Sequence, residues 1–288
     1  MRADNIQVED NVSMLLKAAV GFSKTCAAST FCLEGDIYIF YLDKKKPIEL
    51  DNFYRRIVKR PELLSRIEYD TYGAHNAGKV LEKMIQFSHD CRYHAIIVDS
   101  VTNLTAAAVN WSLAFRGDTS KTKKKDSKDP IIPDWDEYKV ETSLVSQCLD
   151  ICRTLPTNVI WLAHPVPSVK IEGTGTSVKV SKVNPIVTYG SKVAGIVPGN
   201  FSEIYHFSKG VSYDSSGNMK TSYLVSFDAI GDDYAKSNLG LTGEIDITDR
   251  MFYEVWKEKV KALREVSNEN EVVKATEQVV NPFGNVNW

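Results

Sequence analysis

Apolar residues recur along this chain in short, nearly continuous runs, and the stretches between the runs repeat their apolar residues with helical spacing. Runs rich in β-branched and aromatic residues are typical of strands that are covered on both faces. Strands and helices that alternate in this way predict an α/β fold with a mainly parallel central sheet flanked by helices. The expected strands are 12–16, 37–42, 66–72, 95–99, 158–163, 203–207 and 222–227. The expected helices are 24–33, 49–58, 76–90, 101–114, 137–154, 189–197 and 250–265.

Two long segments interrupt this alternation. Residues 116–136 contain a cluster of lysines and then two prolines, which cannot continue a helix, and residues 166–192 are rich in glycine, serine, threonine and lysine. Connections of this length are unusual in compact domains unless they have a function. Beyond residue 265 the chain becomes polar and ends in an apolar tip, as is typical of a mobile tail. We therefore expect one core, 1–265, with two functional loops or hairpins, and a flexible C-terminal tail, 266–288.

Composition narrows the class of protein. Of the 288 residues, 43% are hydrophobic and 25% are charged, and these values exclude wholesale disorder. The 35 basic and 37 acidic residues leave a net charge of -2, which excludes a uniformly basic nucleic-acid-binding surface but not a local basic patch. We expect no signal peptide and no membrane span, because no apolar run is long enough. The five cysteines are scattered and form no CxxC pair, which favours buried thiols and a cytoplasmic location.

A phosphate-binding loop is the first candidate for a functional site. Such a loop needs a buried strand, backbone N–H groups in a tight loop, and a helix start that carries Lys and Ser or Thr. Strand 12–16 is followed by a six-residue loop, 18–23, and then by Lys24 and Thr25 at a helix start. Compared with GxxxxGK[ST], Ala18 and Ser23 replace both flanking glycines, so an ordinary capped helix start is the alternative. The expected nucleotide contacts are Gly21, Phe22, Ser23, Lys24 and Thr25.

Polar residues also follow three other expected strands. Strand 95–99 ends in Asp99, and an apolar strand that ends in Asp near a phosphate loop organises Mg²⁺ and water in nucleotide hydrolases. Asp99 is alternatively the N-cap of the next helix. Asp43 follows the second strand and His164 follows the strand 158–163. Because open α/β sheets bind their ligands at the carboxyl ends of the strands, we expect these residues and Lys24 to meet at one edge.

The order of these segments resembles that of the RecA-like P-loop ATPases, in particular the phage-encoded Sak-type ATPases associated with single-strand annealing. The resemblance covers about residues 10–265, and its most similar segment is Val98-Asp99-Ser100-Val101-Thr102-Asn103-Leu104, which looks like the recombinase signature VDSxxxL. The other segments that carry it are Leu15-Leu16-Lys17, Lys24-Thr25, Phe40-Tyr41-Leu42-Asp43 and Val159-Ile160-Trp161-Leu162-Ala163-His164.

The resemblance implies a RecA-like P-loop fold, ATP and Mg²⁺ as cofactors, and a ring or filament of identical subunits. Lys24 would hold the phosphates, Thr25 and Asp99 would organise Mg²⁺, and Asp43 would orient the attacking water. His164 would couple the nucleotide state to the second long loop.

One position departs from the family pattern. The recombinases carry a catalytic Glu two residues after the Asp that ends the second strand, and the corresponding residue here is Lys45. A lysine cannot act as the general base for water, and Glu49 and Asp43 are the alternatives. Together with the missing glycines, Lys45 predicts slow hydrolysis.

The two long segments fall where the recombinases carry DNA-binding loops. Segment 166–192 contains four lysines and a single acidic residue, Glu172. In segment 116–136 the basic residues cluster at 121–125. Interleaved hydroxyl and glycine residues are suited to phosphate contacts, and Trp135, Tyr138 or Tyr189 can stack on bases. A merely solvated surface is the alternative for both segments. The candidate DNA-binding residues are Lys170, Lys179, Lys182, Lys121, Lys123 and Lys124.

We therefore expect a RecA-like ATP-binding protein or ATPase that binds single-stranded DNA and supports annealing or recombination. The main alternative is a degenerate P-loop scaffold that binds DNA or protein with little or no turnover, and a packaging-type motor is the third. The C-terminal tail is a candidate docking peptide for a neighbouring subunit or for a replication or single-strand-binding protein.

Overall fold

The structure is a computed structural model. It describes residues 11–19, 21, 23–42, 47–116, 133–165, 168–172, 179–183, 186–213, 218–228 and 235–279. For residues 116, 168–172, 179–183, 212–213 and 266–279 it describes the backbone alone.

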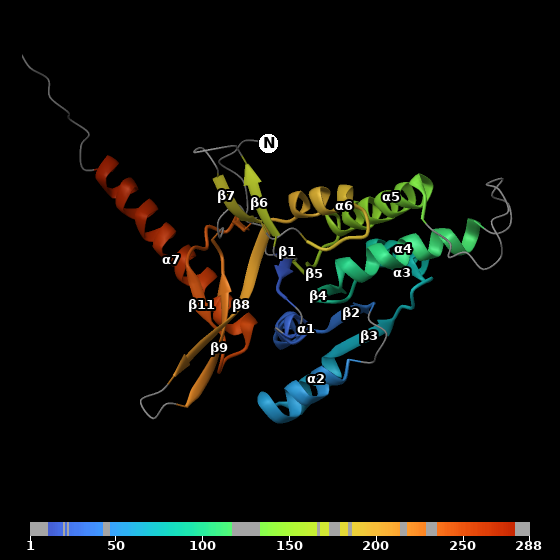
Figure 1. Cartoon of the computed structure of the whole chain (residues 1–288). Helices are drawn as coiled ribbons and strands as arrows, with labels where there is room; N and C mark the ends of the chain where they lie inside the picture. Colours follow the sequence, from blue (N-terminus) through green and yellow to red (C-terminus); the bar gives the residue numbers. More distant parts are fainter. Residues whose placement is uncertain are drawn as a thin grey trace, which may run out of the picture.

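A nine-stranded, mainly parallel sheet forms the centre of the molecule (Figure 1). Its parallel part has the order β3-β2-β4-β5-β1-β8, and β9, β10 and β11 add antiparallel pairs beyond or beside β8. The parallel strands are β1 (Ser13–Lys17), β2 (Ile37–Tyr41), β3 (Ile67–Thr71), β4 (Ala95–Asp99), β5 (Asn158–Ala163) and β8 (Glu203–Tyr213). The antiparallel ones are β9 (Met219–Ser226), β10 (Lys236–Ser237) and β11 (Glu244–Asp246).

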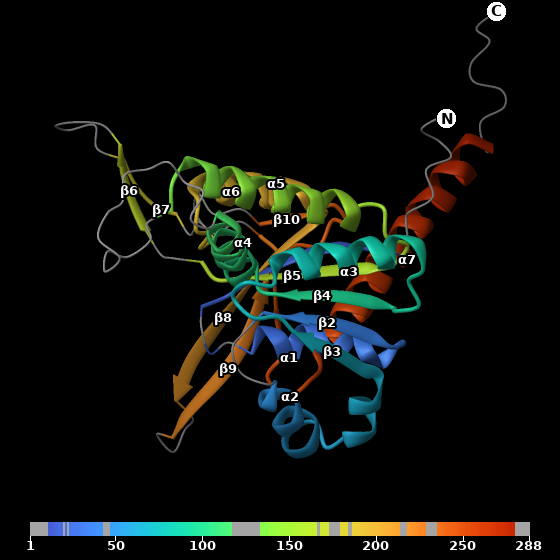
Figure 2. The same ribbon diagram turned by 90° about the vertical axis from the view of Figure 1, so that its right-hand side faces the viewer.

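Helices cover both faces of this sheet (Figure 2). One face carries α3 (Ala77–His89), α4 (Val101–Arg116), α5 (Trp135–Cys152) and α6 (Ser191–Ile196). The other carries α1 (Lys24–Ser29), α2 (Ile48–Asn52) and the start of α7 (Phe252–Val279). Short 3₁₀ or π turns follow at Thr30–Leu33, Phe53–Ile57, Pro61–Arg66 and Pro198–Asn200.

The two cores show why the strands are apolar throughout. Along β1, Leu15 packs into the core beneath α3, α4 and α5, whereas Leu16 packs into the core with α1 and α7. Successive side chains of a strand point to opposite faces, so a strand covered on both faces has no polar side. The expected fold class, a mainly parallel α/β sheet flanked by helices, is confirmed.

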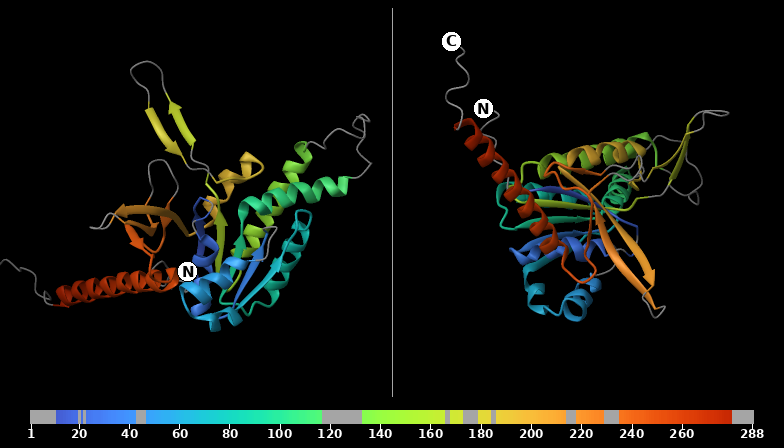
Figure 3. Two further views of the ribbon diagram at one scale, coloured as in Figure 1. Left: turned by 60° about the horizontal axis from the view of Figure 1, so that its bottom comes forward. Right: turned by 90° about the vertical axis from the view of Figure 1, so that its left-hand side faces the viewer.

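The N-terminal end of helix α7 is held against the rest of the fold by hydrogen bonds. Its Trp256 donates the indole N–H to the hydroxyl of Tyr205 at 3.0 Å, and the N–H of Tyr253 donates to the hydroxyl of Thr30 at 3.0 Å. The helix then continues away from the sheet to Val279 (Figure 3). It therefore passes through the boundary at residue 265, where we expected a tail to begin. Residues 280–288 lie outside the described part, so the tail's role as a docking peptide stays a prediction.

The structure describes the two long segments to different extents. Helix α4 ends at Arg116 and α5 begins at Trp135, two residues before the expected start, and Lys121, Lys123 and Lys124 lie outside the described residues. The second segment contains an antiparallel hairpin of β6 (Ser168–Glu172) and β7 (Lys179–Val183) that projects from the sheet (Figures 1 and 3). Lys170 lies on β6 opposite Ser181, and Lys179 and Lys182 lie on β7 opposite Glu172 and Val169.

Candidate nucleotide site

The carboxyl ends of β1, β5 and β4 bring the expected site residues together. Strand β5 lies between the other two, with Ala163 paired to Lys17 of β1 and Leu162 paired to Asp99 of β4. His164 directly follows β5, so it lies between the loop after β1 and Asp99. Residues from three separate parts of the sequence thus share one sheet edge.

The side chain of Lys24 turns back onto the loop that precedes it. Its Nζ atom donates to the carbonyl oxygens of Ala18 and Ala19 at 2.7 and 3.2 Å, and it lies 3.1 Å from Nδ1 of His164. Burial lowers the pKa of Lys24 to about 8, and the nearby charge of Asp99 partly opposes this shift. The ammonium group is therefore held close to several acceptors but is poorly solvated.

Thr25 and Asp99 form a direct contact across the edge. The Thr25 hydroxyl donates to Oδ2 of Asp99 at 2.6 Å. Asp99 is not the N-cap of α4. Ser100 caps this helix instead, because its hydroxyl accepts a hydrogen bond from the N–H of Asn103 at 3.4 Å. The carboxylate of Asp99 is thus directed at the start of α1.

The loop takes an unusual backbone conformation without its flanking glycines. Gly21 has φ +84°, and Ser23 has φ +52° and ψ +33°, a left-handed conformation that favours glycine. Ala18 is not among the described non-glycine residues with positive φ, so of the two residues that replace the glycines only Ser23 has a strained backbone. Ser23 also makes no side-chain cap to α1, which disfavours the ordinary capped helix start. Phe22 lies outside the described residues.

This arrangement fits ATP with Mg²⁺. Mg²⁺ is usually held by one or two protein oxygen ligands together with phosphate oxygens. A hydroxyl and a carboxylate in contact at Thr25 and Asp99, beside the ammonium of Lys24, supply such a ligand set. Within the described ranges no group of three or more His, Cys, Asp or Glu residues gathers as a metal cluster.

The water-activating side of the site is only partly described. Asp43 and Lys45 lie outside the described residues, so their roles stay predictions. Glu49, on α2, accepts a hydrogen bond from the hydroxyl of Tyr41 at 2.7 Å. Burial and then the charges of Glu49 and Asp99 raise the pKa of the Cys26 thiol to about 12. The thiol of Cys26 also lies 3.8 Å from the carbonyl oxygen of Glu49, and Tyr41, which binds Glu49, pairs with Asp99 between β2 and β4. Glu49 is therefore at the same edge as the candidate ion site.

A second polar feature was missed from the sequence. Glu141 is fully buried in α5, where its Oε1 accepts the N–H of Gly190 at 2.9 Å. Burial raises the pKa of this carboxyl group, and the hydrogen bonds from the backbone of Gly190 and Tyr189 oppose the rise. The signal was available, because Glu141 shares the helical spacing of the apolar stripe that includes Val145 and Cys148.

Comparisons with known proteins give fold-level likeness only. No protein-family model matches the sequence, and no curated protein matches it. The chain is similar to the RadB recombinase structure, at 14% identity over 83% of this chain and 89% of that one, with a TM-score of 0.46. It is also similar to the KaiC-like protein PH0186 of Pyrococcus horikoshii OT3, at 12% identity over 82% of this chain and 88% of that one, with a TM-score of 0.41. These values are too low to place the chain in either protein's family.

The described part contains no helix that is both long enough and apolar enough to span a membrane.

Proposed function

We propose that this chain is a RecA-like ATP-binding protein, and a slow ATPase, that acts on single-stranded DNA. The observation that carries the proposal is the contact of 2.6 Å between the Thr25 hydroxyl and the Asp99 carboxylate, at the edge where the ammonium of the preceding Lys24 lies against His164. The three residues that sequence motifs assign to nucleotide binding meet at one sheet edge, although Lys24 and Thr25 begin α1 and Asp99 ends β4.

Each residue has a defined task in this proposal. Bound Mg²⁺ would neutralise phosphate charge, and the oxygen atoms of Thr25 and Asp99 would hold it. Lys24 exchanges its contacts with Ala18 and Ala19 for phosphate oxygens, which restores a charged partner to a buried ammonium group. His164 lies against Lys24 and is positioned to sense this exchange.

The rest of the proposal follows the resemblance. DNA would contact the lysines of the β6–β7 hairpin, Lys170, Lys179 and Lys182, and those at Lys121, Lys123 and Lys124. A phage-type annealing or recombination role in the cytoplasm, assembly into rings or filaments, and a partner-docking C-terminal segment complete it.

One observation favours a degenerate scaffold as the second candidate. Lys24 already has two carbonyl acceptors from its own loop, and Ser23 holds a strained conformation without glycine. A site closed in this way would bind nucleotide weakly and serve to bind DNA or protein without turnover.

Calorimetry with a non-hydrolysable ATP analogue separates the candidates. Wild type should bind in the presence of Mg²⁺, and Lys24→Ala should weaken binding by about tenfold or more, through loss of a charge-assisted contact. Asp99→Asn should remove most of the Mg²⁺ dependence. Lys261→Ala, which removes an exposed lysine of α7, is the matched control and should bind like wild type. No binding by wild type, or equal binding by Lys24→Ala, would contradict the nucleotide site, whereas binding without turnover would favour the scaffold.

A further inference from the structure

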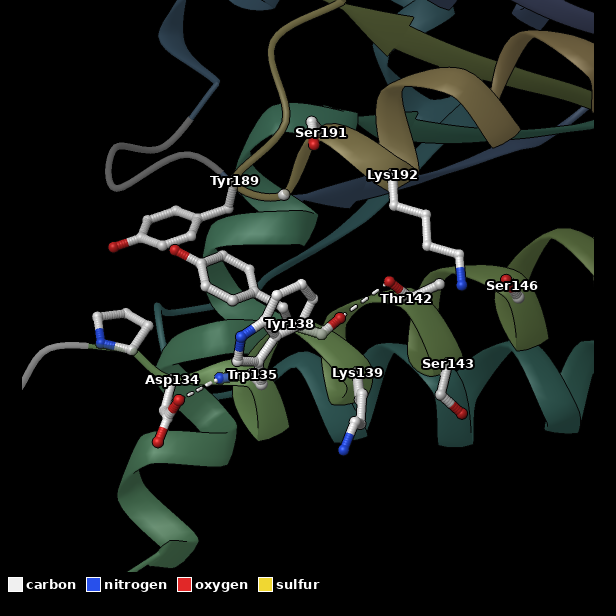
Figure 4. A pocket seen from close by; sticks show the side chains of 12 residues that line it. Asp134, Trp135, Tyr138, Lys139, Thr142, Ser143, Ser146, Tyr189, Ser191 and Lys192 are labelled. Carbon is white, nitrogen blue, oxygen red and sulfur yellow. Dashed lines mark hydrogen bonds between the residues drawn. The ribbon is translucent and has the colours of Figure 1, made fainter. Parts of the chain in front are cut away.

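A groove of about 900 Å³ lies on the side of the sheet that carries α5 and α6 (Figure 4). One wall is the first half of α5, and the other is the segment 189–192 that leads into α6. The groove is lined by aromatic rings, by the hydroxyl groups of Thr142, Ser143, Ser146 and Ser191, by two lysines and by one acidic residue, Asp134.

Three aromatic side chains converge at one end of this groove. Trp135 is 78% exposed and Tyr189 is 49% exposed, so both present ring surface to solvent. The rings of Tyr138 and Tyr189 lie 6.1 Å apart at an angle of 34°, and Figure 4 shows Trp135 next to Tyr138. Exposed aromatic faces in fixed positions are the feature with which proteins stack unpaired bases.

The backbone that carries these rings is held by hydrogen bonds that involve no ligand. Trp135 is the first residue of α5, and its N–H donates to Oδ1 of Asp134 at 2.7 Å. Asp134 also forms a capping box with Glu137. The N–H of Tyr189 donates to the hydroxyl of Thr105 at 3.2 Å. Both walls are therefore built before a ligand arrives, which lowers the entropy cost of binding.

Glu141 fixes the backbone next to Tyr189. Its Oε1 accepts from Gly190, and a Cβ atom at Gly190 would lie 2.5 Å from its Oε2 and 3.3 Å from Cδ1 of Tyr138. Only glycine fits between the carboxylate and the ring without a shift of one wall. The close approach of the two walls thus depends on Glu141 and Gly190 together.

Charge in the groove suits a phosphate backbone. Lys192 extends along the wall toward Thr142 and Ser146 in Figure 4, and Lys139 lies on the opposite side in an exposed pair with Asp136 at 3.0 Å. An exposed ion pair of this kind contributes little and yields readily to another anion. Aromatic faces flanked by lysines and hydroxyl groups match the bases and phosphates of one strand.

We propose that this groove is a base-stacking site for single-stranded DNA, with Trp135 and Tyr189 as the stacking residues. The inference rests on the DNA-binding part of the proposed function and names the surface that contacts the bases. It assigns base contacts to a preformed groove, while the lysines of the hairpin would contact phosphates.

Fluorescence anisotropy with a labelled oligo(dT) and with an abasic strand of equal length and charge tests the site. Wild type should bind oligo(dT) more tightly than the abasic strand. Trp135→Ala and Tyr189→Ala should each weaken oligo(dT) binding by about five- to hundredfold, the range for loss of one stacked base. The slope of log K against log salt should not change, because stacking neutralises no phosphate. The double variant should no longer distinguish the two strands.

Two matched variants complete the design. Phe115→Ala removes another exposed aromatic ring, 75% exposed on α4 outside the groove, and should bind like wild type. Trp135→Phe keeps a stacking ring and should keep most of the affinity.

Oligo(dT) binding that is equal in wild type, Trp135→Ala and Tyr189→Ala would overturn the groove but leave DNA binding by the lysines intact. Absence of any oligonucleotide binding by wild type would overturn the groove and the DNA part of the proposed function together. The ATP-analogue calorimetry would still decide the nucleotide part.

Discussion

Nζ of Lys24 lies 3.1 Å from Nδ1 of His164, although the two residues are 140 positions apart in the sequence. The pairing of β1 with β5 produces this contact, because it aligns the ends of the two strands. The cation that follows the candidate phosphate loop is therefore in contact with a residue shortly before the β6–β7 hairpin.

Above about pH 8 the protein should take up a proton when it binds nucleotide. The pKa of Lys24 in the free protein is lowered to about 8 by burial, and a bound phosphate favours the charged ammonium and raises it again. Affinity should therefore fall as the pH rises above about 8. Calorimetry in two buffers of different ionisation enthalpy measures the uptake, and Lys24→Arg, which stays charged, is the control. Constant affinity up to about pH 9.5 would show that Lys24 does not contact phosphate.

The same shift affects stability without nucleotide. Between the folded pKa of about 8 and the unfolded value of 10.5, the unfolded chain binds one more proton at Lys24 than the folded chain does. The free energy of unfolding should therefore rise with pH over this window, and Lys24→Met should remove that rise.

His164 should couple nucleotide binding to DNA binding. Its carbonyl oxygen accepts the N–H of Val187 at 2.7 Å, and the carbonyl oxygen of Val187 accepts the Thr102 hydroxyl at 2.7 Å. The segment beside Tyr189 is thus attached to the edge that holds Lys24. We expect the ATP analogue to change oligo(dT) affinity by about fivefold or more, and His164→Ala to reduce the change. Anisotropy titrations with and without analogue measure it, and identical coupling in His164→Ala would contradict this role.

Ser23→Gly should relieve strain in the phosphate loop. A left-handed conformation costs a non-glycine residue about 1–2 kcal/mol, so the substitution should stabilise the fold by about 1 kcal/mol and tighten nucleotide binding. Lys59→Gly is a matched control, because Lys59 has φ +58° far along the chain from the loop. Thermal unfolding should show stabilisation by both substitutions, whereas calorimetry should show tighter nucleotide binding only for Ser23→Gly. Weaker binding by Ser23→Gly would mean that the serine side chain itself contacts the ligand.

Gly190→Ala should destabilise the fold and weaken DNA binding. The added Cβ would lie 2.5 Å from Oε2 of Glu141, so we expect a loss of about 1–3 kcal/mol and weaker oligo(dT) binding. Gly195→Ala, in α6, meets no atom within 4 Å and should be neutral or stabilising by up to about 1 kcal/mol. Denaturant unfolding of the two variants makes the comparison, and equal stability would show that the walls can separate freely.

ATP turnover should be slow because of Lys45. A lysine cannot accept the proton of water near neutral pH, and general-base assistance accounts for about 10²–10⁴ in rate. Wild type should therefore turn over below about 1 per second, and Lys45→Glu should raise the rate. Fast turnover by wild type, together with loss of turnover in Glu49→Gln, would show that Glu49 is the general base instead. In the structure Glu49 accepts a hydrogen bond from the hydroxyl of Tyr41 at 2.7 Å. A phosphate-release assay with and without oligo(dT) decides between them.

The sequence alone predicted the parallel strands of the sheet and the residues of the candidate phosphate site. Strands 95–99 and 158–163 were predicted at their observed limits, because strands covered on both faces need uninterrupted apolar runs. Asp99 and His164 were predicted because they stand at the ends of such runs, and parallel strands end at a common edge. Lys24 and Thr25 were predicted because they open a helix after the first strand and a short loop. The start of α5 was placed two residues late, although the capping box of Asp134 and Glu137 was visible in the sequence.

Tertiary structure alone decided what those residues touch. Periodicity does not reveal strand order, so the placement of β5 between β1 and β4, and with it the contact of Lys24 with His164, required the folded sheet. The left-handed Ser23 and the burial of Glu141 against Gly190 are set by neighbours distant in sequence. Trp135 and Tyr189 share a groove because α5 packs beside the segment before α6. Local sequence specifies which face of an element is apolar, whereas long-range packing specifies which faces meet.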